Sequence, residues 1–297
     1  MSKPRSLDLP ARTRAYRLAT PRQEFAVLDS RPEGAVRGTV LLVPGYTGSK
    51  EDFLALLDPL ADAGYRAVAV DGRGQFESPG PRRTSGYTPR ALGGDVLAQV
   101  AALGDGPVHL VGHSFGGFVA RSAARLDPSA FLSLTLLSSG PGRVGPEQRT
   151  KIRMLQAALP VLPPSWVWAA TQWLDGRDPA YISDPPEIVA FLERRWFSTQ
   201  PTQLIATGRQ LRVEPDRTEG LAALPLPLHV AYGSGETVWA VSELAHLARS
   251  VNARHTVILG ADHSPNVSHP GELSAALTEF WASVASGPGA STAPAWL

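Results

Sequence analysis

The chain has 297 residues, 43% hydrophobic and 19% charged, so it can bury a large core and is not disordered as a whole. Its formal net charge of +1 gives no electrostatic reason to expect nucleic acid or an anionic membrane as a partner. The absence of cysteine excludes disulfides and thiolate chemistry. No signal peptide is visible at the N-terminus and no run is apolar enough to span a bilayer, so we expect a cytoplasmic protein.

The first half of the chain alternates between short apolar strands and helices. Residues 1–21 are polar and arginine-rich, and we predict an irregular arm there. Strands are predicted at residues 23–29, 38–43, 66–70, 107–111 and 131–138. Helices are predicted between them, after Ser49 up to residue 63, over 89–103 and over 115–126. This alternation predicts an α/β protein with a doubly wound, mostly parallel sheet.

The strand rhythm breaks in the second half. Residues 141–222 show helical segments, prolines and four tryptophans without a buried strand, which predicts a helical cap inserted into the sheet domain. The alternation then resumes with a strand over 226–232, a helix over 238–250, a strand over 254–259 and a helix over 270–284. We therefore assign the core to residues 22–140 and 223–284, and irregular ends to residues 1–21 and 285–297.

Residues 112–116 read Gly-His-Ser-Phe-Gly between a predicted strand and a predicted helix. This context is typical of a nucleophile elbow, a turn so sharp that glycines such as Gly112 and Gly116 must flank the serine. The turn exposes the Ser114 hydroxyl at the end of the sheet, before a helix N-terminus. The alternative is a glycine-rich turn of a nucleotide-binding fold, and the partners found downstream favour the elbow.

A serine hydroxyl needs a base and a group that orients the base, and in nucleophile-elbow folds the chain order is Ser, Asp or Glu, then His. Glu236 is the first carboxylate after the strand over 226–232, and His263 is the first histidine after the strand over 254–259. We therefore predict a triad of Ser114, His263 and Glu236. Alternatively, Glu236 is a solvated loop residue or complements a helix dipole. Asp262 adjoins His263 and is expected to point away from it.

An oxyanion hole requires two backbone N–H groups aimed at the developing negative charge. We predict that they come from Phe115, directly after the nucleophile, and from Tyr46, in the loop after the strand over 38–43. A plain glycine turn is the alternative for that loop. Aromatic residues suggest an apolar pocket, and we predict substrate contacts from Tyr46, Trp239 and Trp166, with ordinary packing as the alternative.

Together these segments resemble the α/β-hydrolase fold superfamily over residues 22–140 and 223–284. The segments that carry the resemblance are Pro44-Gly45-Tyr46, Asp71-Gly72-Arg73-Gly74, the elbow, Glu236 and Gly260-Ala261-Asp262-His263. The sequence departs from the usual family pattern at Pro44, where histidine is common, at Glu236, where aspartate is more common, and at Asp262, where glycine is usual. The resemblance implies that Asp71 and Arg73 hold their loop.

The resemblance implies a serine hydrolase that acts on an ester, thioester, lactone or related small acyl compound through an acyl-enzyme, without a cofactor or a metal. Haloalkane dehalogenases and epoxide hydrolases of this fold carry aspartate at the elbow, so Ser114 argues against both. Carbon–carbon hydrolysis, acyl transfer and perhydrolysis use the same triad and stay open. A small-molecule receptor or binding protein on this fold is the alternative from another class. The substrate and the oligomeric state are not predicted.

Overall fold

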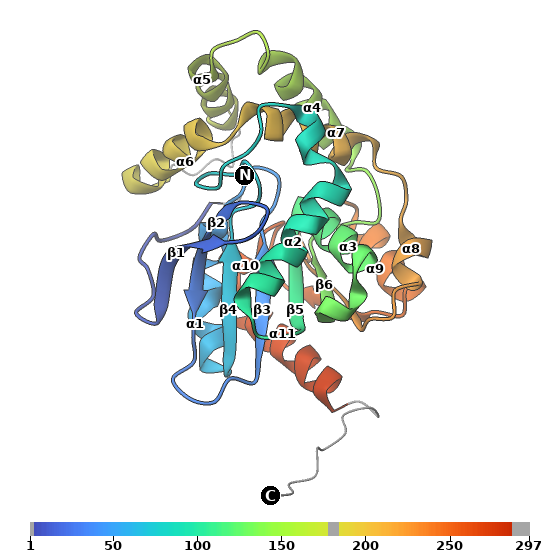
Figure 1. Ribbon diagram of the computed structural model, residues 1–297. Helices are drawn as coiled ribbons and strands as arrows, with labels where there is room; N and C mark the ends of the chain where they lie inside the picture. The colour runs from blue at the N-terminus through green and yellow to red at the C-terminus, as the bar shows by residue number, and fades with distance from the viewer. Residues whose placement is uncertain (1–2, 178–183, 287–297) are drawn as a thin grey trace, which may run out of the picture.

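The computed structural model describes residues 3–177 and 184–286 (Figure 1). In this part of the chain one sheet runs in the order β1-β2-β4-β3-β5-β6-β7-β8. The six strands β4, β3, β5, β6, β7 and β8 are parallel to one another. The pairs β1–β2 and β2–β4 are antiparallel. The predicted α/β fold with a doubly wound, mostly parallel sheet is confirmed.

The strands are β1 (Thr13–Ala19), β2 (Glu24–Ser30), β3 (Gly38–Val43), β4 (Tyr65–Val70), β5 (Val108–His113), β6 (Phe131–Leu137), β7 (Leu228–Gly233) and β8 (Arg254–Ile258). The helices around the sheet are α1 (Leu54–Asp62), α2 (Pro89–Leu103), α3 (Phe115–Leu126), α9 (Val241–Ser250), α10 (Pro265–Ser268) and α11 (Pro270–Ala285). None of the helices within the described ranges is long and apolar enough to cross a membrane.

Side chains of the central strands alternate between two apolar layers. In β3, Leu41 and Val43 join the cluster that contains residues of α2, α3 and α9, while Val40 and Leu42 join the cluster formed with α1 and α11. Each is almost fully buried, and burying such a side chain is worth about 1.5–3 kcal/mol. Helices therefore cover both faces of the sheet, and its strand ends remain available for loops (Figure 1).

The N-terminal arm is a correction to the predicted irregular segment 1–21. Residues Thr13–Ala19 form β1, which pairs with β2 in register from Thr13 opposite Ser30 to Ala19 opposite Glu24. Only Thr13 and Leu18 of this strand are buried, so the apolar alternation that would have predicted it is missing. Backbone hydrogen bonds at the sheet edge hold the strand instead. The predicted irregular C-terminus lies, from residue 287 onward, outside the described residues.

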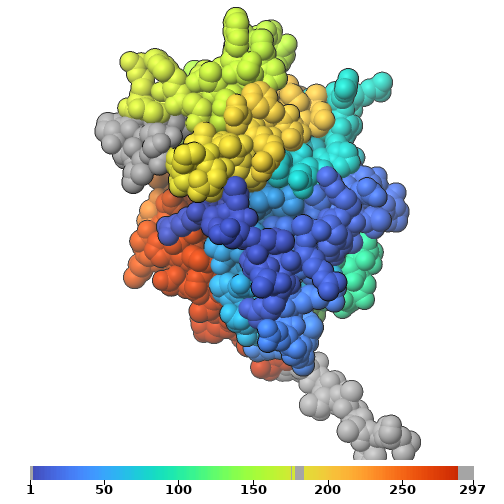
Figure 2. Space-filling view, turned by 90° about the vertical axis from the view of Figure 1, so that its left-hand side faces the viewer, coloured from blue at the N-terminus to red at the C-terminus, as the bar shows by residue number. Residues whose placement is uncertain are grey.

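Between β6 and β7, where the cap is predicted, the described residues form five helices. They are α4 (Pro146–Ala158), α5 (Pro164–Asp175), α6 (Pro186–Ser198), α7 (Pro201–Val213) and α8 (Thr218–Ala222). Helices α4 to α7 contribute to an apolar cluster separate from the two beside the sheet, in which the ring centroids of Trp168 and Trp196 are 6.0 Å apart. Phe76 and Tyr46, from the loops after β4 and β3, also pack against it. This segment covers the upper end of the molecule in Figure 2; that it is a separate domain stays a prediction.

A buried ion pair joins these helices to the core. Arg195 Nη1 of α6 lies 2.8 Å from Asp52 Oδ1, and the two side chains are 2% and 0% exposed. The backbone oxygen of Asp52 also accepts a hydrogen bond of 2.7 Å from Nδ2 of Asn266 in α10. Burial raises the pKa of Asp52 to about 6, although Arg195 opposes the rise. Three segments that are distant in sequence therefore meet at one residue, Asp52: α6 at its carboxylate and α10 at its backbone oxygen.

We expect the Arg195→Met substitution to lower the free energy of unfolding by about 3–5 kcal/mol at pH 8, because it leaves a buried carboxylate without its counter-ion. A carboxyl group whose pKa is raised by folding favours the folded state at low pH, and that contribution is lost as the pH rises through the folded-state pKa. Without Arg195 this pKa rises further, so the loss should be smaller at pH 5 than at pH 8. Urea unfolding at both values measures it.

The control for this prediction is the double variant Arg195→Met with Asp52→Asn, which removes both charges. It should regain part of the stability at pH 8 and lose the pH dependence of the difference. An equal loss at pH 5 and pH 8 in the single variant would show that packing of the Arg195 side chain, and not charge compensation, is what stabilises this contact.

Candidate active site

Ser114 connects β5 to α3 in a strained backbone conformation, with φ 55° and ψ −120°. Such a conformation costs a non-glycine residue about 1–3 kcal/mol. The flanking glycines are required by space: a Cβ on Gly112 would collide with the carbonyl of Gly116, and one on Gly116 would collide with that of Val43. The turn therefore has the geometry of the predicted elbow. The strand and the helix on either side keep Ser114 in its strained backbone conformation.

The three side chains of the predicted triad form an unbroken hydrogen-bonded chain. Ser114 Oγ lies 3.0 Å from His263 Nε2. On the other side of the imidazole, His263 Nδ1 lies 2.8 and 2.9 Å from the two carboxylate oxygens of Glu236. The three residues follow β5, β8 and β7, which end at the same edge of the sheet. The prediction selected these three residues from their order along the chain. In the structure their side chains are in hydrogen-bond contact.

Glu236 occupies an environment that keeps its carboxylate charged. It is 7% exposed, and its Oε1 accepts a hydrogen bond of 2.6 Å from the Val238 backbone N–H. Burial alone would raise the pKa of Glu236, but the hydrogen bond and charge of His263, with the Val238 N–H, lower it below its usual value. Asp262 is exposed and accepts a bond of 2.9 Å from the Ser264 N–H, so it does not contact the imidazole of His263.

His113 contributes a contact that the sequence did not predict. Its Nε2 lies 2.9 Å from the backbone oxygen of His263. Burial, followed by the neighbouring His263, lowers the pKa of His113 to about 3, so the ring is neutral and its Nε2–H donates to that carbonyl. The contact ties the elbow to the loop that carries His263. No sequence pattern signals it, because it depends on where two distant loops meet.

The predicted oxyanion donors lie on both sides of the nucleophile. Phe115 opens α3 directly after Ser114, and a Cβ on Gly45 would lie 3.2 Å from Ser114 Cβ, so the loop carrying Tyr46 runs against the elbow. Within the described part of the chain, neither the Tyr46 N–H nor the Phe115 N–H donates to a protein acceptor. Both are therefore available to a ligand oxygen.

The residues predicted to contact the substrate lie in three different environments. The Tyr46 hydroxyl donates a bond of 2.8 Å to the Leu204 carbonyl in α7. Trp239 is 1% exposed, donates to the Gly142 carbonyl at 3.0 Å and has its ring 6.2 Å from the His263 ring. Trp166 is 66% exposed on α5, so it is not part of the proposed site.

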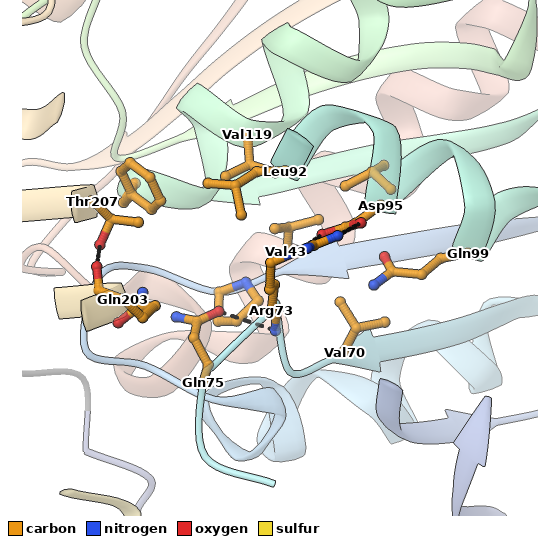
Figure 3. Close-up of a pocket in the computed structure, with 14 residues that line it drawn as sticks. Val43, Val70, Arg73, Gln75, Leu92, Asp95, Gln99, Val119, Gln203 and Thr207 are labelled. Atoms are coloured by element: carbon orange, nitrogen blue, oxygen red, sulfur yellow. Dashed lines mark hydrogen bonds and ion pairs between the residues drawn. The ribbon is translucent and has the colours of Figure 1, made fainter. Parts of the chain in front are cut away.

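A small cavity of about 20 Å³ lies behind the oxyanion loop (Figure 3). Val43, Pro44 and Phe115 are among the residues that line it, and Gln99 and Gln203 contribute side-chain amide groups. The cavity has room for a water molecule and none for an acyl chain. The side-chain amide oxygen Oε1 of each of these two glutamines has no hydrogen-bond partner among the described residues.

The loop after β4 is held by ion pairs, as the resemblance implies. Arg73 donates to both carboxylate oxygens of Asp95, at 2.6 Å to Oδ2 and 2.5 Å to Oδ1. Asp71 is fully buried and accepts bonds from the Lys50 backbone N–H at 2.8 Å and from Lys50 Nζ at 3.0 Å. Among residues 3–177 and 184–286, no cluster of histidines and carboxylates is arranged to hold a metal ion.

A mostly parallel sheet with a strained serine between strand and helix, linked to a histidine and a carboxylate, defines the nucleophile-elbow class of α/β proteins. The chain belongs to the alpha/beta hydrolase family, whose family model matches residues 40–276. That match extends from β3 into α11 and includes Ser114, Glu236 and His263.

Several curated proteins resemble parts of the chain. An epoxide hydrolase of Caballeronia sordidicola is 35% identical over 99 residues, which are 33% of this chain and 30% of that protein. The 3-oxoadipate enol-lactonase 1 of Acinetobacter baylyi is 22% identical over 225 residues, covering 69% of this chain and 74% of its own. In three of the curated relatives, which include this epoxide hydrolase, the matched part is only 28% to 37% of the relative's own length.

Solved structures show the same fold. A thermophilic esterase from Thermogutta terrifontis superposes with a TM-score of 0.73 at 23% identity, covering 91% of this chain and 99% of the esterase. The enol-lactonase from Burkholderia xenovorans has a TM-score of 0.71 at 18% identity, with coverage of 90% and 100%. At these identities the likeness establishes the shared fold and leaves the substrate to the site itself.

Proposed function

We propose that the protein is a serine hydrolase of an ester, thioester, lactone or related small acyl compound. The hydrogen-bonded chain from Ser114 through His263 to Glu236 carries this proposal. Ser114 Oγ attacks the acyl carbonyl while His263 Nε2 accepts its proton, and the carboxylate of Glu236 stabilises the imidazolium that forms. The N–H groups of Tyr46 and Phe115 bind the oxyanion.

The second half of the cycle uses the same groups. Collapse of the tetrahedral intermediate breaks the bond to the leaving group, which takes the proton from His263 and leaves an acyl ester on Ser114. His263 then removes a proton from water, whose oxygen attacks the acyl carbon. The bond from that carbon to Ser114 Oγ breaks, and Oγ takes the proton back from His263, which releases the acid and restores the free serine. The reaction needs no group beyond water and the residues named.

A serine at the elbow favours acyl chemistry over epoxide opening. The epoxide hydrolases of this fold attack the ring carbon with an aspartate, and the family resemblance places Ser114 at that position. The match to the epoxide hydrolase of Caballeronia sordidicola covers a third of this chain, so it supports the family and not the reaction. The enol-lactonase and the esterase among the similar proteins fit the proposal.

Labelling with a fluorophosphonate probe tests the proposal, because such probes phosphonylate only an activated serine. We expect one adduct, located on Ser114 by peptide mass spectrometry. We also expect turnover on a panel of p-nitrophenyl esters with acyl chains from acetate to decanoate. A protein that takes no label and hydrolyses no member of the panel would instead support a small-molecule binding protein on this fold.

A further inference from the structure

One peptide unit connects the oxyanion donor to a buried glutamine. The carbonyl oxygen of Gly45 accepts a hydrogen bond of 2.7 Å from Gln75 Nε2. The same peptide unit carries the Tyr46 N–H, one of the two proposed oxyanion donors. A trans peptide is planar and directs its C=O and its N–H to opposite sides. Whatever orients the Gly45 carbonyl therefore also orients the Tyr46 N–H.

Gln75 is itself held in place by its loop. The side chain is 5% exposed, and its Oε1 accepts a bond of 3.0 Å from the Gly72 N–H. Its backbone N–H donates to the Gly72 carbonyl at 2.9 Å, closing a turn. The oxygen of the amide thus faces the Gly72 N–H while its nitrogen faces Gly45, so a single orientation of the amide satisfies both neighbours.

The peptide after Tyr46 is held from the other side by α7. Gln203 Nε2 donates to the Tyr46 carbonyl at 3.4 Å, and the Tyr46 hydroxyl donates to Leu204. The only other donor to the Gly45 carbonyl in the described residues is the Gly48 N–H, at 3.2 Å. The bond from Gln75 is the shorter of the two, and it is the one made by a side chain that can be changed without altering the backbone.

We propose that Gln75 is a positioning residue for the reaction: it turns the Gly45–Tyr46 peptide so that the Tyr46 N–H faces the oxyanion formed on Ser114. This inference rests on the proposed serine hydrolase function. Gln75 touches no reacting atom, and its contribution appears only when charge develops on the substrate oxygen. It should therefore affect the transition state more than the binding of the ground state.

The Gln75→Leu variant tests the inference with p-nitrophenyl acetate as the substrate. Loss of a whole oxyanion donor lowers kcat about 10²–10³-fold, so a misdirected donor should lower it about 10-fold or more while KM changes little. The inhibition constant of an alkyl trifluoromethyl ketone, whose adduct with serine carries an oxyanion, should rise by a similar factor. The concentration of active serine is titrated with the fluorophosphonate, and kcat is calculated per active serine. A variant that is merely less stable would change neither this kcat nor the inhibition constant of the ketone.

Gln99→Leu is the matched control. Gln99 is also buried and lines the same cavity as Gln75, but it makes no hydrogen bond to the oxyanion loop (Figure 3). Its removal should leave kcat and the ketone affinity within about 2-fold of the wild type, since no donor is redirected. An equal loss of kcat in both variants would overturn the inference in favour of a general packing effect.

The Gln75→Glu variant adds a readout that a packing role would not change. One oxygen of the introduced carboxyl group can still accept from Gly72, but the other donates to Gly45 only when it is protonated. The ratio of kcat between this variant and the wild type should therefore rise as the pH falls from 8 to 5.5. A ratio that does not change with pH contradicts the inference.

The outcomes separate this inference from the function on which it rests. If Ser114→Ala turns over the ester as fast as the wild type, the serine hydrolase proposal fails and the role of Gln75 fails with it. If turnover depends on Ser114 but Gln75→Leu retains the wild-type kcat and ketone affinity, the function stands and the role of Gln75 is wrong.

Discussion

Ser114→Ala should lower kcat for p-nitrophenyl ester hydrolysis about 10⁶-fold, the loss seen when a triad nucleophile is removed. The substitution deletes the oxygen that is proposed to form the acyl-enzyme. Among the described residues, the Ser114 hydroxyl has one hydrogen-bond partner, His263 Nε2 at 3.0 Å. Alanine adopts the same backbone conformation at similar cost, so the fold should persist. Steady-state rates at saturating ester, with the thermal midpoint measured alongside, test both statements.

Ser139→Ala is the matched control for this variant. Ser139 is 1% exposed near the elbow, and its hydroxyl lacks a hydrogen-bond partner in the described part of the chain. Its removal should leave turnover close to that of the wild type. If Ser114→Ala retained more than about a hundredth of the wild-type kcat, a serine nucleophile at this position would be excluded, since triad losses are far larger.

Glu236→Gln should lower kcat about 10⁴-fold while the fold is retained. The amide has the shape of the carboxylate, but its nitrogen presents donors to His263 Nδ1 and so favours the tautomer whose Nε2 carries a proton. That tautomer cannot accept the proton of Ser114. The hydrogen bond and charge of His263 lower the pKa of Glu236 despite its burial, so the site favours a charged carboxylate, and the amide cannot supply that charge to the imidazolium.

The control for Glu236 is Asp262→Asn, a change of the same kind next to His263. Asp262 is exposed and bonded to the Ser264 N–H, so kcat should stay near the wild-type value. Comparable losses in the two variants would show that Asp262 shares the orienting role. Full activity in Glu236→Gln would mean that a different acid orients His263.

Much of the fold could be predicted because buried parallel strands have continuous apolar runs. Residues 38–43 and the elbow helix over 115–126 were predicted with the bounds of β3 and α3. The strand β1 could not be predicted in this way, since an edge strand with two buried side chains carries no such pattern. Its formation depends on hydrogen bonds to β2, which are a tertiary contact.

The candidate site divides in the same manner. Ser114, Glu236 and His263 could be selected because each follows a strand in the order that this fold requires. The contacts of Gln75 with Gly45 and of His113 with His263 could not, because they join loops 30 and 150 residues apart whose meeting depends on side-chain packing. Patterns along the chain identify the groups proposed to react, but not the residues that position those groups.

The strand order has a consequence for the way in which the native protein forms. Residues 138–227 separate β6 from β7, so the pairing of these strands must close a long loop before Glu236 and His263 come near Ser114. Closing long loops slows folding more than it lowers stability. During refolding from urea, helix content followed by circular dichroism should therefore recover before ester turnover does. The time at which ester turnover returns would then report when β7 and β8 join the sheet.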